Sequence, residues 1–429
     1  MRILSSGSHY YTSFSHSIRN NQVFSCFLAD YRVLIRPSGK EIMVRLLAIY
    51  PGMDRRAEML YSLQALSGFG TRTIVIAGRS MGLHGTGYRP LYERYGSVNV
   101  FRPYRDILEM FVCTPLHYDE VLGVAQDFDP DIILSSQEMT MRLSVNLVKR
   151  LHVPIVLWVE TFLHGLSMGK IDMKWRLPYG LLLALAGMPP TLLAWWNWIS
   201  INCDAFVTCN PLDKQFLSSL RFSTRKSVDY IPWPIGLDME RAVQLRTLNK
   251  KNYGIYAGSL SRGKNIEEFS KTIPQILKST PTERFLFIGH GSEEKVIARL
   301  RQKFGNRILY VSDLPKEEVA KLIASAWYAY TPARQYGSWQ FIGDCWALGT
   351  PLVTTYNSGY VQHQHNGLVV SPNEIVSAIN RLFNEEVSYL ELVKGGFSTA
   401  DDRHPKRIAK KLFSILEGCM NAHSKSMCQ

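Results

Sequence analysis

The chain has 429 residues, of which 46% are hydrophobic and 20% are charged, so it is long enough for two domains that each bury a core. This composition excludes a disordered, collagen-like or coiled-coil protein, and its seven cysteines, with no CxxC pair and no zinc-site spacing, indicate a reducing cytoplasm. The net charge of +13 is spread over both halves, which argues against nucleic acid and favours a phosphate-bearing substrate or a membrane surface as partner.

The N-terminal residues 1–42 are rich in Ser and Tyr and hold no apolar stretch of signal-peptide length, so secretion is not expected. From Met43 the sequence changes to an apolar run that closes at Pro51-Gly52, which predicts a buried strand entering a glycine turn. The folded domain therefore begins near Met43, and residues 1–42 are either an extension outside it or an ordered arm on its surface.

Short apolar runs alternate with amphipathic stretches along the rest of the chain, a pattern typical of a parallel sheet covered on both faces. Because the pattern occurs twice, it predicts an α/β protein of two doubly wound, Rossmann-like domains, 43–233 and 234–400, that face each other across a cleft. A proline-rich hinge at 229–236 joins them. A C-terminal helix at 401–421, which could pack back on the first domain, and a tail at 422–429 follow. The predicted strands are 44–50, 73–77, 131–134, 153–159, 204–208, 254–258, 284–288, 307–311, 326–331 and 351–354.

One apolar segment, residues 177–203, interrupts this alternation, because it has the length of a membrane span and no charged residue. A single crossing would place the strands on either side of it on opposite sides of the bilayer, and the Met188-Pro-Pro190 sequence would break a helix. We therefore expect a helical hairpin inserted into one leaflet of the bilayer, or an apolar groove for a lipid acceptor. The alternative is a helix pair buried in the protein core. The residues expected at the membrane are Leu182, Leu185, Trp195, Trp196 and Trp198.

The chemistry-bearing motifs gather after residue 250. The sequence Tyr256-Ala-Gly258-Ser259-Leu-Ser-Arg262-Gly-Lys264-Asn follows a strand and opens a helix, which predicts an anion site built from free backbone N–H groups. Arg262 and Lys264 would add charge-assisted contacts to a diphosphate. The alternative is a tight turn with no ligand.

Two further turns repeat this arrangement. The glycines Gly289 and Gly291 follow the next strand, where they either permit a positive φ or let the backbone approach a nucleotide. A Gln335-Tyr336-Gly337 turn precedes a helix on which Asp344 is the lone acid. That carboxylate is either on a solvated face or an acceptor for ribose hydroxyls.

Together these stretches resemble family 4 of the retaining glycosyltransferases, group 1, which have the GT-B architecture. The motifs that carry the resemblance are YAGSLSRGKN, FIGHGSEEK, DCWALGTPLVTT and NGLVVSP, in this order. The resemblance implies that the second domain binds a nucleotide-diphosphate sugar, with Lys264 on the diphosphate and Asp344 on the ribose. It also implies front-face transfer with retention and no obligatory metal or cofactor.

The chain departs from the family pattern at several positions. Ser259 stands where the family usually has an arginine, and Tyr336 stands where it has the first of two glutamates, so that Gln335 or Tyr336 must contact the sugar. Glu160 replaces a frequent histidine and is the candidate for positioning the acceptor or the sugar. The remaining acceptor-side candidates are Gly52, Arg55, Glu138 and His164.

The leading prediction is thus a glycosyltransferase, peripheral on the cytoplasmic face of the membrane, that acts on a lipid-linked or cell-envelope glycan acceptor. A second hypothesis is a catalytically degenerate GT-B subunit that binds nucleotide or lipid and scaffolds a partner. A third hypothesis is a GT-B relative that epimerises a nucleotide sugar, but this function gives the apolar segment no role.

Overall fold

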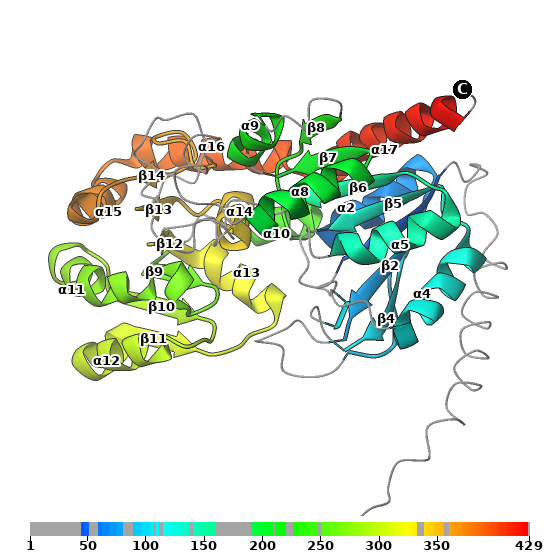
Figure 1. Cartoon of the computed structure of the whole chain (residues 1–429). Coiled ribbons are helices and arrows are strands. Elements are labelled where there is room, and N and C mark those ends of the chain that lie inside the picture. The colour runs from blue at the N-terminus through cyan, green and yellow to red at the C-terminus, as the bar shows by residue number, and fades with distance from the viewer. Residues whose placement is uncertain are drawn as a thin grey trace, which may run out of the picture. The chain divides into compact units, whose positions relative to one another are not determined.

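Two separate β-sheets with surrounding helices make up the described part of the protein in a computed structural model (Figure 1). All described residues belong to the unit Met43–Gln429. The structure describes residues 44–50, 59–79, 89–105, 109–110, 115–136, 140–159, 190–209, 211–219, 226–246, 250–332, 339–355 and 360–427.

The first sheet has eight strands in the order β3-β4-β2-β1-β5-β6-β7-β8. All neighbours pair in parallel except β3 and β4, which are antiparallel. The central strands are buried along their length because helices cover the sheet. Its strands are Val44–Ile49 (β1), Thr71–Gly78 (β2), Tyr92–Tyr95 (β3), Val98–Tyr104 (β4), Ile132–Ser136 (β5), Ile155–Val159 (β6), Ala205–Thr208 (β7) and Ser227–Tyr230 (β8).

The second sheet has six strands, all parallel, in the order β11-β10-β9-β12-β13-β14. The chain order reverses between β9 and β12, which is where ligands bind in open α/β sheets. Its strands are Lys251–Ala257 (β9), Arg284–Ile288 (β10), Ile308–Val311 (β11), Ala326–Thr331 (β12), Leu352–Thr354 (β13) and Leu368–Val369 (β14).

The helices begin and end close to the glycine and proline positions of the sequence. The helices that lie between strands of the first sheet in the chain are Met59–Leu66 (α2), Pro115–Phe128 (α4), Met141–Leu151 (α5), Pro190–Asn202 (α8) and Pro211–Ser219 (α9). Those that follow are Met239–Leu245 (α10), Phe269–Ser279 (α11), Glu294–Phe304 (α12), Lys316–Ser325 (α13), Trp339–Leu348 (α14), Ile375–Asn384 (α15), Glu386–Asp402 (α16) and Pro405–Met427 (α17). Short 3₁₀ turns lie at Ser67–Phe69 (η1), Arg262–Lys264 (η4), Ile266–Glu268 (η5), Gly305–Arg307 (η6) and Pro372–Glu374 (η7).

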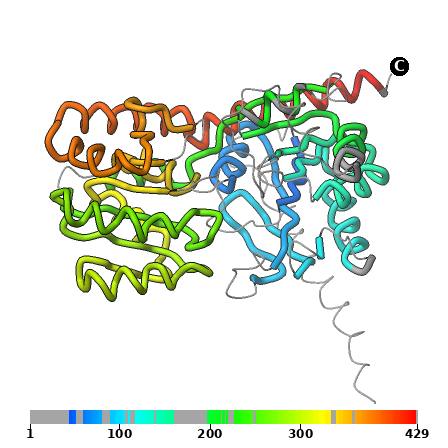
Figure 2. The backbone as a smooth tube through the Cα atoms, turned by 60° about the vertical axis from the view of Figure 1, so that its left-hand side comes forward, coloured from blue at the N-terminus to red at the C-terminus, as the bar shows by residue number. Residues whose placement is uncertain are grey.

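The chain passes between the sheets twice. The segment 231–237 leads from β8 toward α10, and its Ile231, Trp233 and Ile235 side chains are buried. The predicted hinge at 229–236 thus overlaps the last strand of the first sheet, since β8 extends to Tyr230. The return passes through Arg403 into α17 (Figure 2), which packs on α2 of the first sheet. The ring of Phe69, in η1 directly after α2, stacks on that of Phe413 in α17 at 5.5 Å.

The two predicted Rossmann-like domains are confirmed: each has a parallel sheet with helices around it, and the first sheet carries one antiparallel edge strand, β3. The hairpin predicted at 177–203 falls largely outside the described residues, apart from α8, whose first residue is Pro190. Proline is favoured at this first helical position because its missing N–H has no partner there in any case. Within the described ranges, no helix combines the length and the apolar character that crossing a bilayer requires.

Candidate nucleotide-sugar site

A cavity of about 260 Å³ opens at the carboxyl ends of β9, β10 and β11, beside α13 and α14. It combines predicted site residues from three separate motifs, Gly258 and Ser259 after β9, Gly289 after β10 and Asp344 on α14. Its remaining lining residues are Ala257, Ile288, His290, Ser312, Asp313, Leu314, Lys316, Val319, Ile323, Gln340 and Phe341.

The two glycine turns at this edge pack directly against each other. Gly258 N donates to Ile288 O at 2.9 Å and Leu260 N donates to His290 O at 2.9 Å, so the sheet pairing continues into the turns. A Cβ on Gly289, where φ is +132°, would lie 2.0 Å from the carbonyl oxygen of Gly258. Gly289 is therefore required for the packing of the two turns, whatever a ligand adds.

Asp344 is the chemical centre of the cavity. Its side chain is only 8% exposed, and its Oδ1 atom is buried with no hydrogen-bond partner. Burial raises the pKa of Asp344 to about 6, while the charge of Lys316 lowers it. The solvated-face alternative is thus wrong for this acid, because its carboxylate is buried. A buried carboxylate oxygen without a donor costs free energy, and it offers an acceptor to a ligand.

The turn between β11 and α13 was missed by the sequence reasoning. Ser312, Asp313 and Leu314 line the cavity, and Lys316 opens α13, where the positive end of the helix dipole adds to its charge. The sequence does show a strand end followed by a helix start at this turn, as at the other two. It contains no glycine, however, and glycine was the residue by which the other turns were recognised.

The predicted diphosphate residues lie in the neighbouring turn η4. Arg262 is exposed and Lys264 is half-buried, and neither is among the residues that line the 260 Å³ cavity. Asn265 ends the turn with φ at 55° and donates from Nδ2 to Pro332 O at 3.0 Å, which ties η4 to the end of β12. Gly291 lies beyond Gly289, and a Cβ there would lie 2.5 Å from Leu260 O.

A larger cavity of about 550 Å³ lies between α2, the start of α10 and the start of α17. Its charged lining residues are engaged within the protein: Asp238 caps α10 by accepting from Glu240 N and Arg241 N, and Lys406 pairs with Glu240 at 3.8 Å. It therefore offers a ligand less unsatisfied chemistry than the cavity at Asp344.

Several predicted site residues lie outside the described residues. They are Gly52, Arg55, Glu138, Glu160, His164, Leu182, Leu185, Gln335, Tyr336 and Gly337. The side chain of Trp195 also lies outside, whereas Trp196 is 2% exposed and Trp198 is half-buried on α8. The burial of Trp196 corrects its predicted place in a headgroup layer, because this indole is already covered by the protein.

No cluster of His, Cys, Asp and Glu that could hold a metal ion occurs in the described part of the chain. Two acids line the cavity, Asp313 and Asp344, and the charge that acts on Asp344 is the positive one of Lys316. The cavity is thus suited to hydroxyl and amide groups of a ligand on the Asp344 side, and to negative charge near Lys316.

Residues 251–385 match the family model described as glycosyl transferases group 1. This range contains both glycine turns, η4, Lys316 and Asp344. Curated proteins gave no sequence match.

Solved structures match over most of the chain. Sucrose-phosphate synthase from Thermosynechococcus elongatus is 17% identical with a TM-score of 0.69, and the match covers 88% of this chain and 100% of that chain. The E. coli trehalose-6-phosphate protein bound with UDP-2-fluoro glucose is 14% identical with a TM-score of 0.62, covering 87% and 98%. Anabaena HepE in complex with UDP and glucose is 13% identical with a TM-score of 0.62, covering 87% and 100%. At these identities the likeness shows a shared fold, the GT-B fold, and the match at 251–385 together with this fold supports a GT-B glycosyltransferase.

Proposed function

We propose that this chain is a retaining glycosyltransferase that takes a sugar from a UDP-sugar and passes it to a lipid-linked or cell-envelope glycan acceptor at the cytoplasmic face of a membrane. The proposal of a UDP-sugar as the sugar donor rests on one observation. The Oδ1 atom of Asp344 is buried without a hydrogen-bond partner in a cavity at the carboxyl ends of β9 to β11. A ribose would supply the hydroxyl donors that this carboxylate lacks.

A uridine donor is favoured by the relatives of the same fold, two of which hold UDP or a UDP-sugar analogue. With the ribose at Asp344, the diphosphate would extend toward η4, where Lys264 and Arg262 offer positive charge. The leaving diphosphate gains negative charge in the transition state, so cations placed there lower the barrier.

The acceptor side of the proposal rests on sequence features. The net charge of +13 favours an anionic surface, and the uncharged segment 177–203 favours contact with lipid. Glu160, next to the end of β6, would position the acceptor hydroxyl within about 3.5 Å of the anomeric carbon.

The donor site is tested by titrating the purified full-length chain with UDP, GDP and ADP in a calorimeter. We expect UDP to bind, and Asp344→Asn to weaken its binding at least tenfold. Glu317→Gln, an exposed acid on α13, serves as the matched control and should leave the affinity unchanged. Equal affinity of Asp344→Asn and the wild type would refute the placement of the ribose.

Catalysis is tested separately by following UDP-glucose and UDP-galactose hydrolysis with the isolated chain. Slow release of UDP that Lys264→Ala reduces would support a transferase. UDP binding without any release would favour the alternative, a degenerate subunit that scaffolds a partner.

Membrane contact is tested by replacing Leu182 and Leu185 with Ser and measuring binding to vesicles of anionic phospholipid. The variant should lose binding, whereas the exposed apolar residue Val387 on α16, changed to Ser, should not affect it. Unchanged vesicle binding by the first variant would remove the apolar segment from the proposal.

A further inference from the structure

The two places where the chain crosses between the sheets are joined by a backbone hydrogen bond. Ile235 lies on the segment that leads from the first sheet to the second, and Arg403 lies where the chain returns to the first. The N–H of Ile235 donates to the carbonyl oxygen of Arg403 at 3.0 Å. Arg403 thus lies between α16, which belongs to the second sheet, and α17, which packs on the first.

The side chain of Arg403 is buried among aromatic rings. Its guanidinium carbon lies 4.4 Å from the ring centre of Trp339, 5.1 Å from that of Trp346 and 5.4 Å from that of Tyr360. Only 7% of the residue is exposed, and Nη1 has no hydrogen-bond partner. The neighbouring acids Asp401 and Asp402 pair instead with Arg407. The electron-rich ring faces therefore contribute to the compensation for burying Arg403, together with the more distant charge of Asp402.

The rings around Arg403 connect two functional parts. Trp339 and Trp346 belong to α14, the helix that carries Asp344. Tyr360 follows β13 and its hydroxyl donates to Cys209 O, just after β7 of the first sheet, at 3.2 Å. The contact between Arg403 and these rings therefore links the nucleotide-site helix to the first domain.

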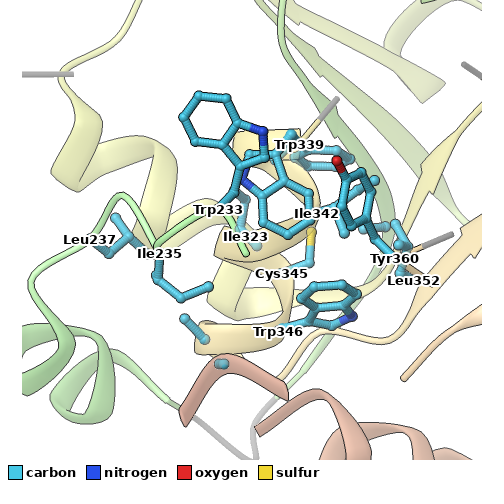
Figure 3. Packing of buried hydrophobic residues seen from close by; sticks show 14 of the residues in the cluster. Trp233, Ile235, Leu237, Ile323, Trp339, Ile342, Cys345, Trp346, Leu352 and Tyr360 are labelled. Atoms are coloured by element: carbon cyan, nitrogen blue, oxygen red, sulfur yellow. The ribbon is translucent and has the colours of Figure 1, made fainter. Parts of the chain in front are cut away.

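The outgoing segment packs on the same helix. A Cβ on Gly343, directly before Asp344, would lie 3.2 Å from Cδ1 of Ile235. Figure 3 shows Trp339, Cys345 and Trp346 on α14 together with Trp233 and Ile235 of the connecting segment. Both crossings thus contact the helix that holds the nucleotide-site acid.

We propose that Arg403 is a positioning residue that fixes α14, and with it the Asp344 carboxylate, in one orientation relative to the first domain. The proposal rests on the proposed function for its role in transfer, since a bound donor sugar would have to meet an acceptor held by the first domain. The geometric part, one fixed orientation of the two domains, can be measured without any substrate.

The test compares small-angle X-ray scattering of the full-length wild type, Arg403→Met and Arg246→Met. Arg246 is the matched control, because its guanidinium also lies over an aromatic ring, Phe397 at 3.9 Å, and also contacts α14 through Ala347 O at 2.9 Å. Both of these partners belong to the second domain.

We expect Arg403→Met to increase the radius of gyration and to broaden the distance distribution, while Arg246→Met leaves both unchanged. Arg403→Lys, which keeps the cation, should restore much of the wild-type curve. Tyr360→Phe, which removes the hydrogen bond to Cys209 O, should show a smaller change of the same kind and covers the case in which Arg403→Met does not fold.

Affinity for UDP separates this proposal from the proposed function. Arg403→Met should bind UDP within about threefold of the wild type, since the lining of the cavity is intact. Wild-type scattering from both Arg403→Met and Tyr360→Phe would overturn the positioning role. Failure of the wild type to bind UDP would instead count against the proposed function, and the scattering result would still stand.

Discussion

Lys316 and Asp344 line one cavity from two different helices, and the positive charge of Lys316 opposes the rise that burial causes in the pKa of Asp344. The first turn of α13 thereby stabilises the ionised form of a carboxylate that α14 carries. Four predictions follow from this pair and from the turns around it.

Asp344 should make the protein less stable at neutral pH. Its pKa is about 6 in the folded state against an ordinary value of 3.8, so the folded state binds the proton more tightly than the unfolded state. The free energy of unfolding therefore falls as the pH rises from about 4 to about 6, and stays lower above that. Asp344→Asn should be more stable than the wild type by about 2 kcal/mol at pH 7.5. Urea unfolding at pH 4.5 and pH 7.5 measures this difference, and an equal difference at both values would contradict the prediction.

Removing the charge of Lys316 should leave Asp344 harder to ionise. Lys316→Met is expected to raise the pKa of Asp344 further and to weaken UDP binding at pH 6.5 by about fivefold, with a smaller effect at pH 8. Lys321→Met provides the control, because Lys321 is on the same helix but pairs with the exposed Glu318 at 2.7 Å. Calorimetric titration at the two pH values distinguishes them, and identical behaviour of the two variants would exclude Lys316 from the site.

Gly289 should not tolerate any side chain. A Cβ there would lie 2.0 Å from Gly258 O, and backbone cannot move aside as a flexible side chain can. Gly289→Ala is therefore expected to lose about 3 kcal/mol or more of stability. Gly263→Ala, in the neighbouring turn, has nothing within 4 Å of the added Cβ and should change stability by less than about 0.5 kcal/mol. Thermal unfolding of the two variants checks the contrast.

Lys264 should act on the diphosphate and not on the nucleoside. Lys264→Ala is expected to weaken UDP binding by about 2 kcal/mol and to leave uridine binding unchanged. Lys278→Ala, on the exposed end of α11, should affect neither. A parallel loss for uridine and UDP would show that the substitution disturbs the fold of η4 rather than a phosphate contact.

Much of the fold could be predicted from the sequence because buried parallel strands are continuous apolar runs. The 284–288 and 326–331 strands have the predicted ends, and others differ by a few residues. Strands β3, β4, β8 and β14 were not predicted. In β4 the reason is Arg102, which makes the strand look like a surface segment. In the structure that arginine is fully buried and pairs with Glu93 on β3 at 3.0 Å, a cross-strand compensation that no local pattern reveals.

The candidate site was predicted in part for a similar reason. Glycines at strand ends and a lone acid on an apolar helix are local signals, and they identified Gly258, Gly289 and Asp344. Lys316 and Arg403 carry no such signal, because each stands in an ordinary polar stretch. Their surroundings arise only where distant segments meet, as they do where Arg403 lies between Trp339 of α14 and Tyr360.

The packing of α17 on α2 has a consequence for how the protein is made. The apolar residues Ile408, Leu412 and Leu416 are fully buried on this last helix, which follows the whole second sheet in the chain. During synthesis the first sheet leaves the ribosome long before the helix that covers α2, so its apolar face stays open until α17 has been made. The first domain is therefore completed only after the second sheet, although its own strands are made first.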